Sequence, residues 1–369
     1  MHNQSTPGID IVGSFLPPEK LVEARSRHAA GEIEKGLLHA IEDEAVARLV
    51  EDQIASGLTE ITSGEFRRSQ WDKDFWFGLE GIRRERVESG HIYQAIDPYT
   101  DFIRFMGRIA YNPDHPFFND FAYLHEIAKG RAYCRQTLPS PANLYLEILS
   151  MTDGHPKLVY PGASRLIDDI AETYNMTMRR FYELGCRHIQ LDDTACGRLC
   201  QNNYINRLLQ GGVDLISVHE KIIRLLNTSV EGLPSDLEIS LYISGGDTVI
   251  PDWNSRLLPD NIIPKALSNV NVGKFFLPFQ PCDYCRLEVL RHIPHGTSVV
   301  LGLADAHSPF TERDFYIVET VAKASKYISA RNLSVSHKTG FKLSSYLSRG
   351  LTYDSQWQKL SLLREALYA

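Results

Sequence analysis

A (β/α)8 barrel is the fold that this 369-residue sequence predicts, as one domain spanning residues 1–369. Two observations lead to it: about eight short apolar segments alternate with helical patterns, and most of these segments end in Gly, Ser, Asp, Glu or His. Alternating strands and helices are typical of a parallel sheet. The carboxyl ends of such strands share one rim, where barrels bind their ligands. A doubly wound open sheet is the alternative arrangement of the same segments.

The first two predicted strands, residues 9–12 and 58–62, each lead into a glycine and a polar side chain. Gly13 and Ser14 follow the first strand, and a turn of this kind exposes backbone N–H groups that can hold a carboxylate. Glu65 follows the second strand after a Ser-Gly pair. The later strands are expected at residues 133–138, 186–191, 237–243, 273–279, 298–303 and 332–336. Helical spacing of apolar residues marks residues 43–56, 164–184, 213–227, 312–329 and 354–368.

The strand at residues 186–191 is followed by two adjacent carboxylates, Asp192 and Asp193. Acids at the end of a buried strand have a desolvation cost unless a cation or a hydrogen-bond donor meets them. The pair is therefore a candidate ligand-binding position. The alternative is that the two residues cap the next turn or helix.

Residues 70–130 are rich in aromatic side chains and are interpreted as an excursion from the barrel that packs on itself or covers a site. Trp71 is the first of these rings. Plain packing of an insertion explains most of them, because aromatic side chains bury large areas.

Composition and charge exclude several classes of function. The chain is 43% hydrophobic and 23% charged, with a net charge of −7 and no run of basic residues. We therefore expect a small-molecule substrate and no nucleic-acid partner. The first residues are polar and no apolar run reaches membrane-spanning length, so we expect neither a signal peptide nor a membrane partner. Six cysteines in a chain of this length are no disulfide scaffold, which favours a cytoplasmic protein.

Several motifs follow one another along nearly the whole chain. They are Val12-Gly13-Ser14-Phe15, Gly64-Glu65-Phe66-Arg67-Arg68 with Trp71 and Asp74-Phe75, Leu138-Pro139-Ser140-Pro141, Gly185-Cys186-Arg187, Gln190-Leu191-Asp192-Asp193-Thr194 and Val299-Val300-Leu301-Gly302-Leu303. In this order they resemble the short, single-barrel relatives of cobalamin-independent methionine synthase, which correspond to the catalytic C-terminal half of the full-length enzyme. One such match would be unspecific, whereas several in the right order are specific.

The resemblance implies a barrel whose rim holds homocysteine. Carried onto this chain, Gly13 and Ser14 would face the amino-acid carboxylate, while Glu65 and Asp192 would face the ammonium group. An ammonium ion gains from two partly buried carboxylates, and they gain from it. Relatives with this barrel also lead us to expect a homodimer.

The zinc half of the family's site is not matched in this sequence. The resemblance implies a His and a Cys two residues apart, a Glu and a final Cys, and zinc held there lowers the pKa of the substrate thiol. The corresponding positions here are Tyr242, Ser244, Pro278 and Thr339. We therefore predict no cofactor and no zinc at the family's position. A relocated metal would draw on the cysteines Cys196, Cys200, Cys282 and Cys285.

Without zinc, the chemistry would rest on acid–base groups at the rim. The candidate acids or bases are Tyr242, Asp193, His307 and His337. Further candidate substrate contacts are Trp71, Ser244 and Asp247. Each acid–base candidate except Tyr242 also has a purely structural interpretation: Asp193 as a turn cap and the two histidines as exposed side chains. Asp247 has one as well, because it would stabilise the Gly-Gly loop that precedes it.

The favoured function is a zinc-independent transferase or lyase that acts on a small amine- and carboxylate-bearing or specialised-metabolite substrate. One alternative is methyl transfer from methylfolate to homocysteine with a relocated zinc site. Another alternative is a ligand-binding protein without catalysis.

Overall fold

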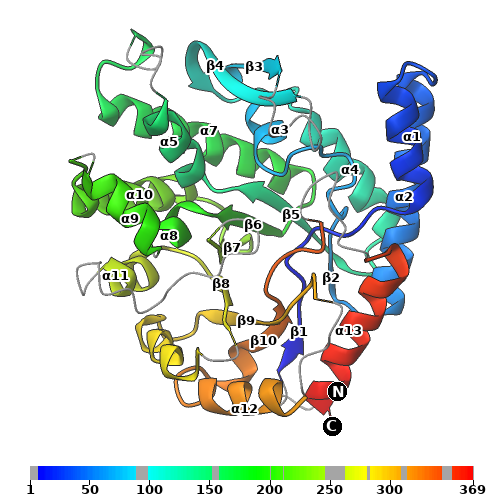
Figure 1. The fold of residues 1–369 in the computed structure, drawn as a ribbon, viewed down its shortest axis with the longest axis vertical. Coiled ribbons are helices and arrows are strands. Elements are labelled where there is room, and N and C mark those ends of the chain that lie inside the picture. The colour runs from blue at the N-terminus through cyan, green and yellow to red at the C-terminus, as the bar shows by residue number, and fades with distance from the viewer. Residues whose placement is uncertain are drawn as a thin grey trace.

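Eight parallel strands form a closed barrel at the centre of the computed structural model, and helices surround it (Figure 1). The structure describes residues 7–88, 99–151, 158–199, 201–210, 212–245, 262–280, 283–308, 314–342 and 351–368. The strands follow the order β1-β10-β9-β8-β7-β6-β5-β2. A parallel bridge between Ser14 and Gly64 joins the ends of β1 and β2 and completes the ring. The predicted (β/α)8 fold is confirmed, and the open-sheet alternative is excluded.

The barrel strands are β1 (Gly8–Ile9), β2 (Glu60–Ile61), β5 (Tyr133–Pro139), β6 (His188–Asp193), β7 (Glu238–Ile243), β8 (Lys274–Pro278), β9 (Ser298–Ala304) and β10 (Leu333–His337). Each lies within or beside a segment that the sequence predicted. These strands are buried on both faces, against the barrel interior and against the helices. Apolar side chains dominate β9, whereas β5, β6, β7 and β10 also carry buried polar side chains. Strand β6 extends to Asp193, so both carboxylates belong to the strand.

The helices are α1 (Glu19–Ala29), α2 (Lys35–Ala55), α3 (Lys73–Trp76), α4 (Pro116–Ala128), α5 (Pro141–Ser150), α7 (Ala163–Glu183), α8 (Ala195–Arg198), α9 (Asn202–Gln210), α10 (Leu215–Val230), α11 (Ile262–Asn269), α12 (Asp314–Ala324) and α13 (Tyr353–Tyr368), with 3-10 turns η1 (Asp283–His292) and η2 (Ala330–Asn332). In α7, Ile170, Tyr174 and Phe181 form one buried stripe at helical spacing. Gly185, with a φ of 97°, follows the end of α7 in a conformation that glycine adopts without strain.

The aromatic excursion consists of α3 and a two-stranded antiparallel hairpin. The hairpin pairs β3 (Glu80–Glu88) with β4 (Tyr99–Ala110) and lies beside α3 and α7 at the top of Figure 1. The sequence also placed residues 116–128 in the excursion, but they form α4, an outer helix of the barrel between β2 and β5. Phe118 of α4 packs on Phe181 of α7, with 4.9 Å between ring centroids.

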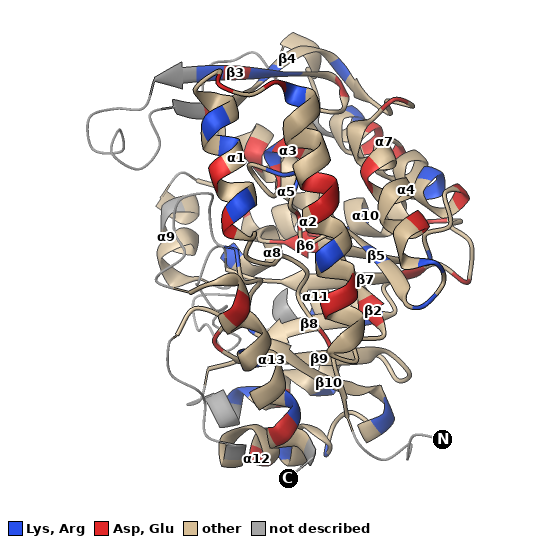
Figure 2. Ribbon diagram, turned by 90° about the vertical axis from the view of Figure 1, so that its right-hand side faces the viewer, with Lys and Arg blue, Asp and Glu red and all other residues tan. Residues whose placement is uncertain are grey.

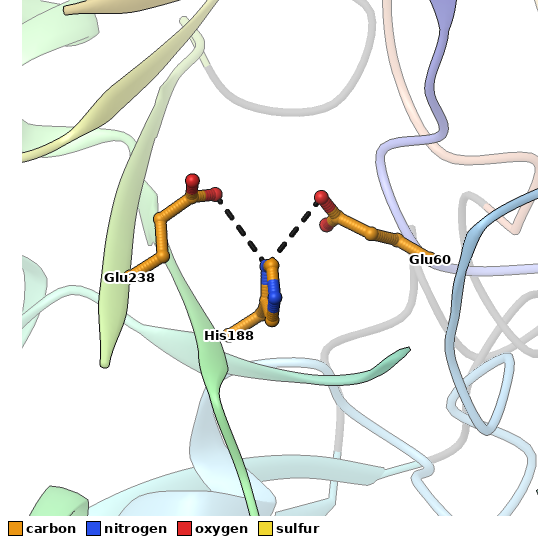
Figure 3. A group of neighbouring side chains, drawn as sticks. All are labelled: Glu60, His188 and Glu238. Carbon is orange, nitrogen blue, oxygen red and sulfur yellow. Dashed lines mark ion pairs between the residues drawn. The ribbon is translucent and has the colours of Figure 1, made fainter. Parts of the chain in front are cut away.

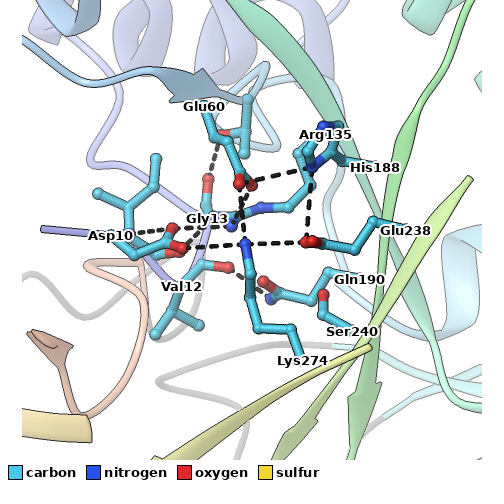
Figure 4. A network of polar contacts seen from close by, with 12 residues as sticks. Asp10, Val12, Gly13, Glu60, Arg135, His188, Gln190, Glu238, Ser240 and Lys274 are labelled. Carbon is cyan, nitrogen blue, oxygen red and sulfur yellow. Dashed lines mark hydrogen bonds and ion pairs between the residues drawn. The ribbon is translucent and has the colours of Figure 1, made fainter. Parts of the chain in front are cut away.

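The interior of the barrel is layered. Near the amino ends of the strands, acidic and basic side chains form one network, drawn in Figure 4: Asp10, Glu60, Glu238, Arg135, His188 and Lys274. Above it, the side chains of Val12, Phe276 and Val300 pack together with Tyr242. Arg135 connects the two layers, because its guanidinium lies 5.1 Å from the centroid of the Phe276 ring.

The C-terminal helix α13 packs where the chain leaves β1. The side chain of Gln356 accepts the backbone N–H of Leu16 at 2.8 Å, and Trp357 stacks on Phe15 with 5.3 Å between centroids. These contacts fix the backbone just after Ser14. Positions of charged residues of both signs are interspersed along the helices in the ribbon of Figure 2. Among the described residues, no helix has both the length and the apolar character that crossing a membrane requires.

Candidate active site

One cavity of about 300 Å³ lies at the carboxyl ends of the barrel strands. It is lined by residues that follow or end β1, β2, β6, β7 and β10, and by the loop before α3. The lining residues are Val12, Ser14, Glu65, Ser69, Gln70, Trp71, Asp72, Lys73, Asp192, Thr194, Tyr242, Ser244, Thr339, Gly340 and Lys342. The structure therefore brings together these predicted site residues: Ser14, Glu65, Trp71, Asp192, Tyr242 and Ser244. Gly13, with a φ of 135°, lies between two lining residues.

Glu65 enters the cavity from a tight turn after β2. Gly64 and Glu65 have left-handed backbones, with φ of 65° and 59°, and a Cβ on Gly64 would lie 2.4 Å from Leu49. A left-handed glutamate costs about 1 kcal/mol or more. Hydrogen bonds to the Glu65 side chain offset part of this cost, because Arg68 and Thr137 donate to Oε1 at 3.0 and 2.8 Å. No described residue donates to Oε2, which leaves that oxygen for a ligand.

Asp192 reaches the same cavity from the end of β6. Gln190 donates to its Oδ1 at 2.7 Å and also to the carbonyl of Val12 at 2.6 Å, which fixes the carboxylate relative to β1. No described residue donates to Oδ2. Burial, and next the negative charge of Glu65, raise the pKa of Asp192 to about 8. A cation placed between the two carboxylates would reverse this shift.

Ser14 and Lys342 form a second corner of the cavity. The Ser14 hydroxyl accepts the backbone N–H of Lys342 at 3.3 Å. Gly340 permits this approach, because a Cβ there would lie 2.0 Å from Ser14 Oγ. The Lys342 ammonium donates to the carbonyl of Arg68 at 2.6 Å. Burial, and next the charge of Arg25, lower the pKa of Lys342 to about 8.

A third corner carries hydroxyl groups and is called the hydroxyl corner below. It consists of Tyr242 and Ser244 from the end of β7 and Thr339 from the turn after β10. Tyr242 Oη donates to the carbonyl of Lys338 at 2.8 Å. Thr339 Oγ1 lies 3.0 Å from Nε2 of His307. The predicted acid–base residue His307 therefore reaches the cavity lining through Thr339.

Of the predicted acid–base residues only Tyr242 lines the cavity; His307 touches a lining residue, and Asp193 and His337 have other, structural contacts. Asp193 accepts hydrogen bonds from the Ser140 hydroxyl and the backbone N–H of Cys196, both at 2.6 Å, which are the contacts of a cap on α8. His337 is buried below the rim and packs against Phe341 with 4.7 Å between ring centroids. The interpretation of His307 and His337 as exposed side chains is wrong, because both are buried at strand ends.

Some predicted residues lie outside the described part of the chain. They are Asp247, Cys200, Cys282 and the side chain of Cys285. Cys196 is described and is buried. A relocated metal site at these cysteines therefore stays a prediction.

Zinc does not fit the residues at the positions that the sequence resemblance assigns to the family's metal. Tyr242, Ser244 and Thr339 offer hydroxyls and Pro278 offers no ligand atom, whereas zinc in proteins takes thiolate, imidazole or carboxylate. All three hydroxyls are already engaged with protein groups: Tyr242 with the Lys338 carbonyl, Thr339 with His307, and Ser244 with Tyr242. Among the described residues that touch these positions, His307 supplies one imidazole, which is too few ligands for a zinc site.

A second cluster of metal-ligating residue types lies at the opposite end of the barrel. Glu60, His188 and Glu238 place ligand atoms within 4.8 Å of one another (Figure 3). Lys274 supplies the positive charge there, because its Nζ lies 2.8 Å from an oxygen of Glu60 and of Glu238. Burial lowers the pKa of His188, but its ion pairs with Glu238 and Glu60 outweigh that effect and raise it to about 9. With Asp10 and Arg135, the cluster is a charge-balanced structural network (Figure 4).

The loop before α3 forms one edge of the cavity. The sequence indicated this loop only through Trp71. Asp74 accepts the backbone N–H groups of Ser69 and Gln70 at 2.6 and 3.1 Å and so shapes this loop. Asp72 lines the cavity, and burial raises its pKa to about 6.

The fold and the cavity define a (β/α)8 barrel with a polar ligand pocket on its carboxyl rim, which is the arrangement of barrel enzymes. No protein-family profile matches the chain. The uncharacterized protein YxjG of Bacillus subtilis is 29% identical over 353 residues, which is 95% of this chain and 91% of that protein. A methionine synthase of Saccharolobus islandicus is 20% identical over 361 residues, which is 97% of this chain and 95% of that protein.

Solved structures show the same similarity to methionine synthases. A Listeria monocytogenes protein with a provisional assignment as a vitamin-B12-independent methionine synthase superposes with a TM-score of 0.75 at 26% identity, covering 98% of this chain and 99% of that one. A B12-independent methionine synthase from Shewanella, solved in complex with selenomethionine, superposes with a TM-score of 0.70 at 19% identity, covering 99% and 97%. The chain is a single-barrel homologue of cobalamin-independent methionine synthase.

Proposed function

We propose that the protein binds a small amine- and carboxylate-bearing molecule in the rim cavity and acts on it, without zinc at the family's position, by transferase or lyase chemistry. The observation that supports this proposal is the pair of carboxylates, Glu65 and Asp192, that line one cavity with an oxygen each left for a ligand.

The amine is the part of the ligand that the electrostatics define best. Arg68 compensates the charge of Glu65 through its 3.0 Å ion pair. Asp192 has no ion-pair partner among the described residues, and an unpaired buried carboxylate is costly. A ligand ammonium would supply the missing charge and form charge-assisted hydrogen bonds to both acids.

The carboxylate of the ligand would lie in the corner of Ser14 and Lys342. Lys342 lines the cavity there, beside the Gly13-Ser14 turn to which the sequence resemblance assigns this group. The Shewanella relative was solved with selenomethionine, an amino acid that carries both groups.

Turnover would use proton transfer at the rim. His307 is the imidazole that reaches the lining, through its contact with Thr339. Binding without turnover is a second candidate function, and a specific observation favours it: the polar atoms of Tyr242 and Asp193 are engaged in structural hydrogen bonds.

Calorimetric titration with 2-aminobutyrate, butyrate and propylamine tests the proposal, because these probes carry both groups, the acid alone and the amine alone. We expect only 2-aminobutyrate to bind well. Glu65→Gln and Asp192→Asn should each weaken its binding about tenfold or more, because each removes a charge-assisted contact. Glu51→Gln, which changes an exposed carboxylate on α2, is the matched control. Equal binding of all three probes would contradict the proposal.

Mass spectrometry of incubated amino-acid mixtures then separates an enzyme from a binder. New products favour the enzyme, whereas stabilisation without products favours the binder. Methyl transfer from methylfolate to homocysteine, measured with and without added zinc, tests the methionine synthase alternative. We expect it to stay at background, because a thiol near its ordinary pKa is a poor nucleophile without metal activation.

A further inference from the structure

We propose that Asp72 binds a second cationic group of the ligand, so that the molecule in the rim cavity is a diamino acid. The inference rests on the proposed function, because it takes the α-ammonium position at Glu65 and Asp192 and the carboxylate position at Lys342 as given. Asp72 would thereby determine which amino acids the cavity accepts.

The cavity is lined by three carboxylates, and the α-ammonium of the ligand accounts for only two of them. Glu65 and Asp192 would share that group. Asp72 lies in the loop before α3, which forms one edge of the cavity, and the hydroxyl corner carries no charge that could meet it. Burial raises the pKa of Asp72 to about 6, so its carboxyl is largely ionised at pH 7.

The Asp72 carboxylate has no cationic partner among the described residues. It accepts the backbone N–H of Lys73 at 2.8 Å, and its own backbone N–H also stabilises the charge. No lysine, arginine or histidine in the part of the chain that the structure describes forms an ion pair with it. A partly buried carboxylate without a counter-charge costs free energy, and a cationic group of the ligand would offset that cost.

Lys73 is the neighbouring cation, and contacts with the hairpin hold its ammonium beyond ion-pair distance of Asp72. The ammonium donates to the carbonyl of Asp101 at 2.7 Å and lies 6.0 Å from the centroid of the Phe102 ring. Both contacts are made by β4. Burial outweighs the charge of Lys73 in its effect on the pKa of Asp72. The protein itself therefore leaves the charge of Asp72 largely uncompensated.

The loop that carries Asp72 is fixed to the same hairpin. Gln70, which also lines the cavity, donates through Nε2 to Oδ2 of Asp101 at 3.2 Å. Asp101 is buried and also accepts hydrogen bonds from Arg84 and Arg86 of β3. A support of this kind holds a binding group in place before the ligand arrives.

A diamino acid supplies one group for each charged position of the cavity. Its carboxylate would lie at Lys342, its α-ammonium at Glu65 and Asp192, and its side-chain ammonium at Asp72. A neutral side chain would leave the charge of Asp72 unpaired, and an acidic side chain would add a like charge beside it. The cavity of about 300 Å³ is at the small end of ligand pockets, which suits a single amino acid.

Calorimetric titration of the full chain with matched pairs of L-amino acids tests the inference. Each pair is a diamino acid and its neutral analogue: 2,4-diaminobutyrate with 2-aminobutyrate, ornithine with norvaline, and lysine with norleucine. We expect the diamino acid of the best-fitting length to bind about tenfold or more tightly than its analogue. Asp72→Asn should abolish this preference and leave the affinity for the neutral analogue within about threefold of wild type, which also shows that the variant is folded.

Two further variants separate a direct contact from a general effect of charge. Asp72→Glu keeps the carboxylate and should retain a preference for a diamino acid. Glu147→Gln is the matched control, because the charge of Glu147 reaches Asp72 although Glu147 does not line the cavity. We expect Glu147→Gln to keep the preference of the wild-type chain.

Several results would overturn the inference. If 2-aminobutyrate binds but no diamino acid binds more tightly than its analogue, Asp72 holds no cation and the proposed function stands. The inference is also wrong if Asp72→Asn weakens both members of a pair equally, which would place the α-ammonium at Asp72, or if Glu147→Gln removes the preference. If none of these amino acids binds to the wild-type chain, the proposed function fails and this inference fails with it.

Discussion

The hydroxyl of Tyr242 donates to the carbonyl oxygen of Lys338 at 2.8 Å and so ties β7 to the turn after β10. Burial, and next the charge of Asp192, raise the pKa of this phenol above its ordinary value, so it stays protonated. The contact gives the hydroxyl a structural use that competes with an acid–base role.

We expect Tyr242→Phe to lower the free energy of unfolding by about 1 kcal/mol, because the buried Lys338 carbonyl loses its donor. Binding of 2-aminobutyrate, which has no hydroxyl, should stay within about threefold of wild type. Urea denaturation and calorimetry measure the two effects. Turnover reduced about 100-fold or more with binding intact would instead assign an acid–base role to the hydroxyl.

Proton release on ligand binding follows from the raised pKa of Asp192, which burial and the charge of Glu65 set at about 8. At pH 7 the empty protein holds this carboxyl largely protonated, and an ammonium ligand favours the ionised form. We therefore expect binding at pH 7 to release up to about one proton, and release to disappear above about pH 9. Calorimetry in buffers of different ionisation enthalpy measures it. Release that persists in Asp192→Asn would contradict this origin.

The raised pKa of Asp192 also makes the stability of the protein depend on pH. The pKa of Asp192 is raised above its ordinary 3.8, so between pH 4 and 8 the native state keeps a proton that the unfolded state has lost. The contribution of Asp192 to stability is therefore full at low pH and is lost as the pH rises through 8. Asp192→Asn should gain stability relative to wild type at pH 8 more than at pH 4, by thermal unfolding at both values.

Substitutions of Asp193 distinguish its two possible roles, as a cap of α8 and as an acid–base group. We expect Asp193→Ala to destabilise the protein by about 2–3 kcal/mol, because the Ser140 hydroxyl and the Cys196 N–H lose their acceptor. Asp193→Asn keeps the size of the side chain and one acceptor oxygen, so it should destabilise the protein less. A folded Asp193→Asn protein with normal turnover supports the cap. Stability retained with turnover lost would support the acid–base role.

The fold was predictable because barrel strands and outer helices have different apolar patterns. Residues 164–184 show a stripe at helical spacing and form α7, whereas residues 237–243 alternate apolar and polar side chains along most of their length and form β7. Short elements such as α8 and α11 were missed, because so few turns leave no clear periodicity. The extent of the aromatic excursion was wrong at α4, where large rings face the core of an ordinary barrel helix.

The site was predictable only where strand ends determine it. Ser14, Glu65 and Asp192 share a cavity because the carboxyl ends of parallel strands meet at one rim. Which of two adjacent acids faces the cavity was not predictable, because both faces of a barrel strand are buried and hydrophobicity does not distinguish them. Lys342 was missed because a turn after β10, and no strand, delivers it to the cavity.

The network below the cavity makes Lys274 a strong determinant of stability. Its ammonium lies 2.8 Å from Glu60 and Glu238 and 3.6 Å from Asp10. We expect Lys274→Met to lower the free energy of unfolding by about 3–5 kcal/mol, because it leaves buried carboxylates without their cation. Lys20→Met, which breaks an exposed pair with Glu44, should change it by less than about 1 kcal/mol. Urea denaturation at pH 7 compares them, and equal effects would contradict the assigned role of the network.

Gly340 controls the geometry of the corner of Ser14 and Lys342, where the carboxylate of the proposed ligand would lie, because a Cβ on Gly340 would lie 2.0 Å from Ser14 Oγ. We expect Gly340→Ala to displace Ser14 and weaken 2-aminobutyrate binding about tenfold, with a stability loss of about 1–2 kcal/mol. Gly36→Ala in α2, where an added Cβ would meet no atom within 4 Å beyond the helix's own backbone, should leave binding unchanged. Wild-type affinity in Gly340→Ala would place the ligand carboxylate away from Ser14. Since the substitution changes no charge, a loss of affinity separates the shape of this corner from the electrostatics of Asp192.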